Sequence, residues 1–94
     1  MIVLQIEHKV ANFAGWKQAF DSDPVGRERL NVRRYRILRA VDDPNFAIIE
    51  LEFDSVSDAE ALLAAMQAVW GRVQGSLIDS PRTRIAELVE TKAY

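Results

Sequence analysis

The chain has 94 residues and a mass of 10.7 kDa, enough for one domain with one hydrophobic core. Hydrophobic residues make up 49% and charged residues 28%, which is typical of a folded domain, and a net charge of −2 disfavours bulk electrostatic binding to nucleic acid or membrane. The sequence has no cysteine and a single histidine, which excludes disulfides, thiolate chemistry and a metal site built from several histidines of one chain.

The N-terminal sequence MIVLQIEHKV lacks the basic start and the small-residue cleavage site of a secretion signal. No stretch of the sequence approaches the roughly 20 apolar residues that a membrane span requires. The sequence therefore predicts a cytoplasmic protein that folds as a single domain over residues 1–94. Neither a membrane nor a nucleic acid is an expected partner.

Residues 2–10 alternate between apolar and polar side chains, which predicts a half-buried strand. Asn12 is a typical N-cap for a short helix whose apolar stripe is made by three aromatic residues, Phe13, Trp16 and Phe20. Pro24 is expected to end this helix, because it biases the residue before it away from helical backbone. Residues 24–31 then form either a loop or one short helix with Asp23 as its cap.

Two further alternating segments, residues 32–41 and 46–53, are predicted strands. Residues 42–45 (DDPN) between them are typical of a turn. Because the connection is so short, the two strands are expected to pair as a hairpin.

A long helix is predicted over residues 57–74. Ser57, with a glutamate three positions later, has the pattern of a capping box at its start, and Gly75 suits the C-terminal cap. Pro81 is expected in the loop that follows, and residues 83–92 are expected to form the last strand.

The predicted order β-α-β-β-α-β is that of a ferredoxin-like α+β fold, with a four-stranded antiparallel sheet and two helices on one face. The other face mixes apolar side chains with charges of both signs: Val3, Gln5, Glu7, Val32, Arg34, Arg36, Leu38, Ile48, Glu50 and Glu52. It is either a solvated face, with ion pairs worth about 0–1 kcal/mol each, or the self-complementary surface of a two-fold dimer.

The segment from His8 to Asp21, HKVANFAGWKQAFD, resembles the H-x-V-x-[DN]-[FY]-x-x-W-[KR]-x-x-F-D opening of small bacterial proteins in the dimeric α/β-barrel superfamily. The segments VRRYRILR (32–39) and IELEF (49–53) resemble the same group. The superfamily includes cofactor-free antibiotic-biosynthesis monooxygenases, polyketide cyclases, haem-degrading enzymes and many members without an assigned role. The resemblance implies a homodimer through the sheet face that carries Arg34, Arg36, Glu50 and Glu52.

The resemblance also implies a ligand pocket between sheet and helices, lined by residues that include His8, Trp16, Phe20, Tyr35 and Trp70. His8 has an ordinary pKa near neutrality, so it could act as a general base on an acidic phenol or a 1,3-dicarbonyl carbon. Its alternative role is a strand-end histidine held by Asn12 or by the backbone. Tyr35 could donate a hydrogen bond to a carbonyl or enolate, or simply to a partner within the protein.

The remaining candidate ligand-binding residues are aromatic or basic. Trp16 and Phe20 serve either as core or as a ligand platform, and Trp70 could stack on a flat ligand beside the small residues of its helix. Arg27 or Arg29 could gate the pocket or meet an acidic ligand.

An RNA-recognition motif shares the predicted topology, but its third strand presents aromatic side chains to bases. Here that strand reads FAIIELEF, with Glu50 and Glu52 on the open face, where they would repel phosphate. The haem-degrading members of the superfamily usually supply a histidine ligand from after the second helix. Here Trp70 has about the right place but no histidine follows it, so the resemblance does not imply haem binding unless His8 substitutes.

These observations give one main functional hypothesis and two alternatives. The main one is a cofactor-independent monooxygenase or cyclase for a small aromatic or polyketide-like molecule, with catalytic His8 and Tyr35 and ligand-binding Trp16, Phe20, Arg27 and Trp70. The alternatives are a ligand-binding protein without chemistry and a structural homodimer whose pocket is filled by its own side chains. No metal or cofactor is expected, and whether the protein is an enzyme stays open.

Overall fold

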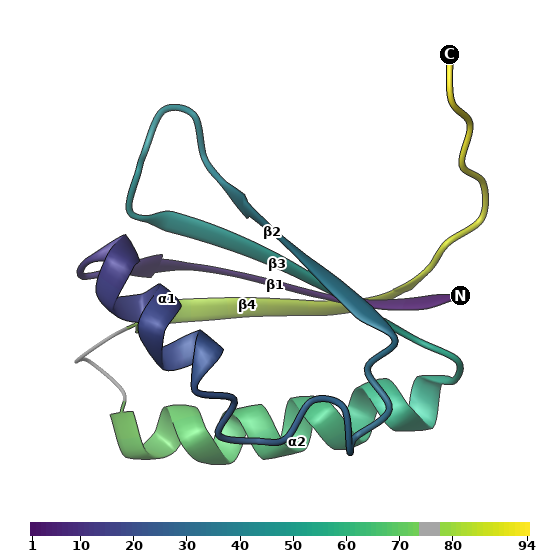
Figure 1. Cartoon of the computed structure of the whole chain (residues 1–94), viewed down its shortest axis with the longest axis horizontal. Helices are drawn as coiled ribbons and strands as arrows, with labels where there is room; N and C mark the ends of the chain where they lie inside the picture. The colour runs from purple at the N-terminus through teal and green to yellow at the C-terminus, as the bar shows by residue number, and fades with distance from the viewer. Residues whose placement is uncertain (74–77) are drawn as a thin grey trace.

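A computed structural model describes residues 1–73 and 78–94, so the predicted cap Gly75 lies outside the described residues. Six elements follow the predicted order: β1 (Ile2–Val10), α1 (Phe13–Asp21), β2 (Arg34–Arg39), β3 (Phe46–Phe53), α2 (Val56–Val73) and β4 (Ile78–Glu87). The strands form an antiparallel sheet in the order β2-β3-β1-β4, and both helices lie on one face of it (Figure 1). The ferredoxin-like fold is confirmed.

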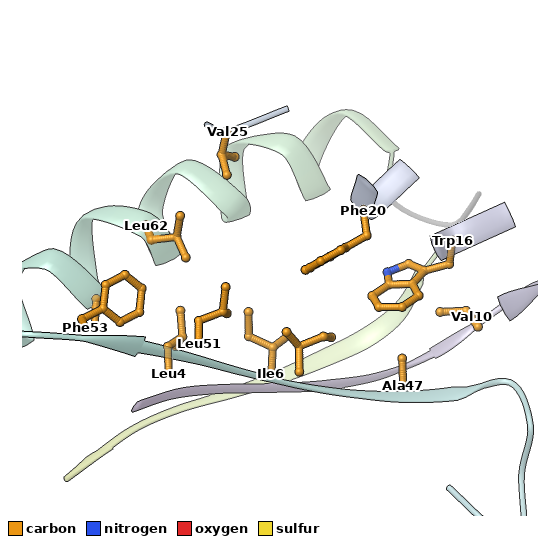
Figure 2. Packing of buried hydrophobic residues seen from close by; sticks show 12 residues of the cluster. Leu4, Ile6, Val10, Trp16, Phe20, Val25, Ala47, Leu51, Phe53 and Leu62 are labelled. Atoms are coloured by element: carbon orange, nitrogen blue, oxygen red, sulfur yellow. The ribbon is translucent and has the colours of Figure 1, made fainter. Parts of the chain in front are cut away.

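The hydrophobic core lies between the sheet and the helices (Figure 2). The central strands β1 and β3 bury every second side chain toward the helices, as their alternating sequences predict. Helix α2 adds Ala59 and Leu62, and α1 adds Trp16 and Phe20. Because burial of one large apolar side chain stabilises a fold by roughly 1.5–3 kcal/mol, this layer provides the main driving force for folding.

Helix α1 begins as its sequence predicts. Asn12 has extended backbone, and its side-chain oxygen accepts a hydrogen bond from the Gly15 amide at 2.8 Å. After α1 the chain makes a series of turns, in which Asp23 and Gly26 adopt left-handed backbone with φ of 53° and 71°. Such residues cannot continue a right-handed helix, so of the two predicted alternatives for residues 24–31 the structure shows the loop.

The predicted capping residue of α2, Ser57, is wrong, because the cap lies two residues earlier at Ser55. The Asp58 amide donates to the Ser55 hydroxyl at 3.2 Å, and the Ala59 amide donates to the Ser55 carbonyl at 3.3 Å. Ser55 is therefore the capping residue, because its hydroxyl stands three residues before an otherwise unpaired amide of the first turn. Ser57 lies inside the helix and is exposed.

The last strand also differs from its prediction, because β4 spans 78–87 rather than 83–92 and includes Pro81. In the pairing with β1, Glu7 lies opposite Arg82 and Lys9 lies opposite Asp79, so β4 carries one extra residue as a bulge. A proline is tolerated there because β4 is an edge strand and the bulge interrupts the hydrogen-bond ladder. Pro81 is therefore not in a loop.

Strand β2 is shorter than predicted and begins at Arg34. The alternation of β2 does not reach back to Val32, whose amide donates to the Arg27 carbonyl at 3.1 Å and whose side chain packs against the core. Val32 therefore does not belong to the open face of the sheet, contrary to the prediction.

The new position of the helix cap is testable with two matched variants. Ser55→Ala is expected to lower the free energy of unfolding by about 1 kcal/mol, because it leaves a first-turn amide without its acceptor. Ser57→Ala should change it by less than about half as much. Urea unfolding of both variants and the wild type makes the comparison, and a larger loss for Ser57→Ala would restore the cap predicted from the sequence.

Candidate functional site

An apolar pocket of about 250 Å³ lies between α1, the turns that follow it and the second half of α2. Its lining is mostly apolar or aromatic and consists of Trp16, Ala19, Phe20, Ser22, Pro24, Val25, Arg27, Met66, Val69 and Trp70. All four predicted ligand-binding residues, Trp16, Phe20, Arg27 and Trp70, are therefore brought to one pocket.

Aromatic rings form a continuous row on the helix-facing side of the sheet. Trp16 contacts His8 with ring centroids 5.7 Å apart and Phe20 with centroids 5.3 Å apart. Phe20 in turn meets the Tyr35 ring edge to face at 5.1 Å. Trp16 and Phe20 can join the row because residues four apart share one helix face. The two predicted catalytic residues stand at opposite ends of this row, and neither lines the pocket.

His8 is buried, with 3% of its surface exposed, and lies opposite Ala47 of β3. Its Nδ1 stands 3.3 Å from the Lys9 carbonyl oxygen, which fits the tautomer with the proton on Nδ1. Burial lowers the pKa of His8 below its ordinary value of 6.5 because the charged imidazolium is poorly solvated there. His8 is therefore neutral at pH 7, as a base must be, but Trp16 and the backbone are its contacts.

Arg27 packs against the Phe20–Tyr35 end of the aromatic row. Its guanidinium carbon lies 3.9 Å from the Phe20 ring centroid and 5.0 Å from that of Tyr35. Its Nη1 donates to the Phe20 carbonyl at 2.8 Å and stands 3.6 Å from an Asp23 carboxylate oxygen. Tyr35 itself is 42% exposed, so it lies at the outer end of the aromatic row rather than in the buried core.

The open face of the sheet carries paired charges on neighbouring strands. Arg36 of β2 pairs with Glu50 of β3, which also accepts a hydrogen bond from Gln5 at 3.1 Å. The hydrogen bond from Arg36 holds the pKa of the Glu50 carboxyl below its ordinary value. Arg34 pairs with Glu52 at 2.8 Å. The other Glu52 oxygen, Oε1, is buried and has no hydrogen-bond partner among the described residues.

Other kinds of site find no support in the described part of the chain. In residues 1–73 and 78–94, no three acidic or histidine side chains are grouped as they would be around a metal ion. Within the same ranges, no helix is both long enough and apolar enough to span a membrane.

Acidification is expected to destabilise the protein through His8. The pKa of His8 is 6.5 in the unfolded chain and lower in the folded protein. Between the folded-state and unfolded-state pKa the unfolded chain therefore binds more protons, so the free energy of unfolding falls as the pH drops below about 6.5. Glu50 titrates at lower pH and does not contribute there. Urea unfolding of His8→Gln should depend less on pH than that of the wild type between about pH 7.5 and 5.5. Parallel profiles would show that another group is responsible.

No family model matches the sequence, and no curated protein matches it. Solved structures do match nearly the whole chain. A candidate antibiotic biosynthesis monooxygenase from Deinococcus radiodurans is 12% identical with a TM-score of 0.72, covering 100% of this chain and 98% of that one. A dimeric ferredoxin-like protein from an uncultured marine organism is 11% identical with a TM-score of 0.67, covering 97% of each chain.

A third similar structure is a variant of MhuD with two manganese protoporphyrin IX molecules bound per active site. It is 16% identical with a TM-score of 0.70, and the match covers 100% of both chains. This chain therefore shares its ferredoxin-like fold, a four-stranded antiparallel sheet with two helices, with these solved structures, one of them a candidate antibiotic biosynthesis monooxygenase.

Proposed function

We propose that the protein binds a small, flat, partly apolar organic molecule in the pocket between α1 and α2. The observation that carries this proposal is the lining itself, in which Trp16, Phe20 and Trp70 surround a space of about 250 Å³ beside the Arg27 guanidinium. Ligand sites are typically concave, mostly apolar and equipped with a few polar groups. The volume is slightly below the roughly 300–1,000 Å³ usual for drug-sized ligands, so one or two fused rings fit best.

The pocket also bears on the alternative of a purely structural protein. A structural role requires the space between helices and sheet to be filled by the chain's own side chains. Ala19 and Val69 leave part of the space between α1 and α2 open, while the sheet-facing core around Leu4, Ile6 and Leu51 is closed. The open space lies where the aromatic side chains are, which favours a ligand over a packing defect.

A cofactor-independent monooxygenase or cyclase is the second candidate, favoured by the neutral His8 and by the monooxygenase-type structural neighbours. In such a reaction a neutral base removes a proton from an acidic phenol or 1,3-dicarbonyl carbon. His8 contacts Trp16, which lines the pocket, but does not line it itself. Catalysis by His8 therefore requires the Trp16 ring to turn aside, so the geometry supports binding more directly than catalysis.

We also propose that the protein is a homodimer through the sheet face that carries Arg34, Arg36, Glu50 and Glu52. Leu38 on this face is 43% exposed and lies opposite Ile48 of β3, and Ile48 in turn lies opposite Glu7 of β1. A partner donor would satisfy the unpaired Oε1 atom of Glu52, since an unsatisfied buried acceptor costs roughly 1–3 kcal/mol. One similar structure is itself a dimeric ferredoxin-like protein. The cytoplasmic location stays a prediction.

Two matched variants, each replacing an alanine of α1 by phenylalanine, test the binding proposal. Ala19 lines the pocket and Ala14 is exposed on the same helix, so Ala19→Phe should block the pocket while Ala14→Phe leaves it open. The readout is the pair of indole N–H signals in ¹H–¹⁵N spectra, since both tryptophans of the chain line the pocket. Two-ring aromatic compounds should shift these signals in the wild type and Ala14→Phe, and not in Ala19→Phe.

If no such compound shifts either indole signal in the wild type, the pocket is not a ligand site. If a bound compound is also turned over, the protein is an enzyme rather than a binding protein without chemistry. His8→Ala should lower the rate of turnover by about 100-fold or more, as expected for loss of a general base, with little change in binding. An unchanged rate removes His8 from the mechanism.

Two glutamate replacements test the dimer. Leu38→Glu adds a charge to the open sheet face opposite the apolar Ile48, whereas Val41→Glu adds the same charge to a fully exposed turn position. Light scattering of the wild type should give about twice 10.7 kDa. Leu38→Glu should shift the mass toward the monomer because it buries an unpaired charge, while Val41→Glu stays dimeric. A monomeric wild type, or a dimeric Leu38→Glu, contradicts this interface.

A further inference from the structure

Arg27 gives the pocket a chemical preference that its apolar walls alone do not provide. Among the described residues it is the one charged side chain in the pocket lining, and only 13% of that side chain is exposed. Arg29, which the sequence offered as an alternative, points its guanidinium over Gly26 and does not line the pocket. No carboxylate lines the pocket in the described part of the chain.

The hydrogen bonds around the pocket show which donors are free. The Ser22 hydroxyl donates to the Ala19 carbonyl at 2.6 Å, so its proton is already engaged. In the described structure the hydrogen bond of the Arg27 guanidinium comes from Nη1, which leaves Nε and Nη2 as donors. Figure 2 shows the indole nitrogen of Trp16 on the side of its ring that faces Phe20. Among the described side chains of the lining, the free donors thus belong to Arg27 and the two indoles, and they suit an acceptor.

The guanidinium is also held in place before any ligand arrives. Its plane is fixed by Phe20 at 3.9 Å and Tyr35 at 5.0 Å, and its Nη1 is fixed by the Phe20 carbonyl. An arginine ordered in this way loses little conformational entropy on binding, and its fork of N–H groups matches the two oxygens of a carboxylate.

Asp23 offsets part of this positive charge, but from a different side. Its carboxylate lies 3.6 Å from Nη1, the nitrogen already used for the Phe20 carbonyl. Asp23 and Glu28 line a second hollow together with Arg27 and Tyr35, and neither carboxylate lines the apolar pocket. Arg27 thus lines both spaces, and an anion in the apolar pocket approaches it from the one that the two carboxylates do not line.

We propose that the ligand of this pocket is a flat aromatic carboxylate, whose rings lie among Trp16, Phe20 and Trp70 and whose carboxylate accepts hydrogen bonds from Arg27. The proposal rests on the proposed function, since it names the chemical class of molecule that the same pocket binds. An uncharged amide with the same two rings would fill the same apolar space. It would offer the guanidinium a weaker acceptor, because hydrogen bonds between charged groups are the stronger ones.

The test compares 1-naphthoate with 1-naphthamide, which share one ring system and differ in charge. Both are titrated into the full chain at pH 7.5 while the two indole N–H signals are followed. The wild type is expected to bind 1-naphthoate at least about tenfold more tightly than 1-naphthamide. Arg27→Gln should lose this preference while still binding 1-naphthamide, and the control Arg29→Gln should keep it. Arg27→Lys should keep part of the preference, because it retains the charge without the fork.

Each outcome bears on a different part of the proposal. Equal affinities for the two compounds in the wild type overturn the anionic class and leave the pocket as a ligand site. Absence of any indole shift with either compound overturns the proposed function itself. A preference that survives in Arg27→Gln shows that another group recognises the anion. If Arg27→Gln does not fold, the wild-type comparison still decides the ligand class, and Arg27→Lys decides whether the guanidinium fork sets it.

Discussion

The pairing of β1 with β3 is the constraint on which the other features depend. It sets Leu4 opposite Leu51, Ile6 opposite Ile49 and His8 opposite Ala47, all facing the helices. Side chains alternate with a period of two, so a slip of one residue would turn this apolar set to the open face and bring Glu50 and Glu52 into the core. The same register therefore fixes the core, the charged open face and the end of the sheet at which His8 is buried.

The pocket follows from how the two helices fill the layer above this sheet. Helix α1 sends two large rings, Trp16 and Phe20, down to the strands, while small side chains such as Ala19 stand between α1 and α2. Large rings beside Ala19 and Val69 leave a space that the chain itself does not fill. Arg27 closes one wall, because the left-handed turns at Asp23 and Gly26 bring the chain back over Phe20. The pocket is thus a product of residue sizes on α1 and of the turn geometry after it.

Periodicity was enough to predict the element order and the sheet faces, because alternation reports directly which side of a strand is buried. It did not place Ser55, Val32 or Pro81, whose positions depend on where a neighbouring strand ends or carries a bulge. Likewise, alternation gave His8 and Tyr35 the correct side of the sheet, but not their positions at the two ends of an aromatic row. Met66 and Val69 share the helical stripe of Trp70, and that spacing could have indicated them as lining residues.

The aromatic row serves the core and the pocket at once, and this limits what a substitution can reveal. Trp16 contacts His8 and Phe20 within the core while one side of it lines the pocket, so its removal would lower stability and change the site together. Loss of binding in such a variant could not be assigned to the ligand contact. Ala19 differs, because it lies outside the buried core and lines the pocket. Arg27 packs on Phe20 and Tyr35, so its role in recognition shows only in the comparison of a charged with a neutral ligand. Stability and recognition are therefore separable by substitution at Ala19, and by the choice of ligand at Arg27.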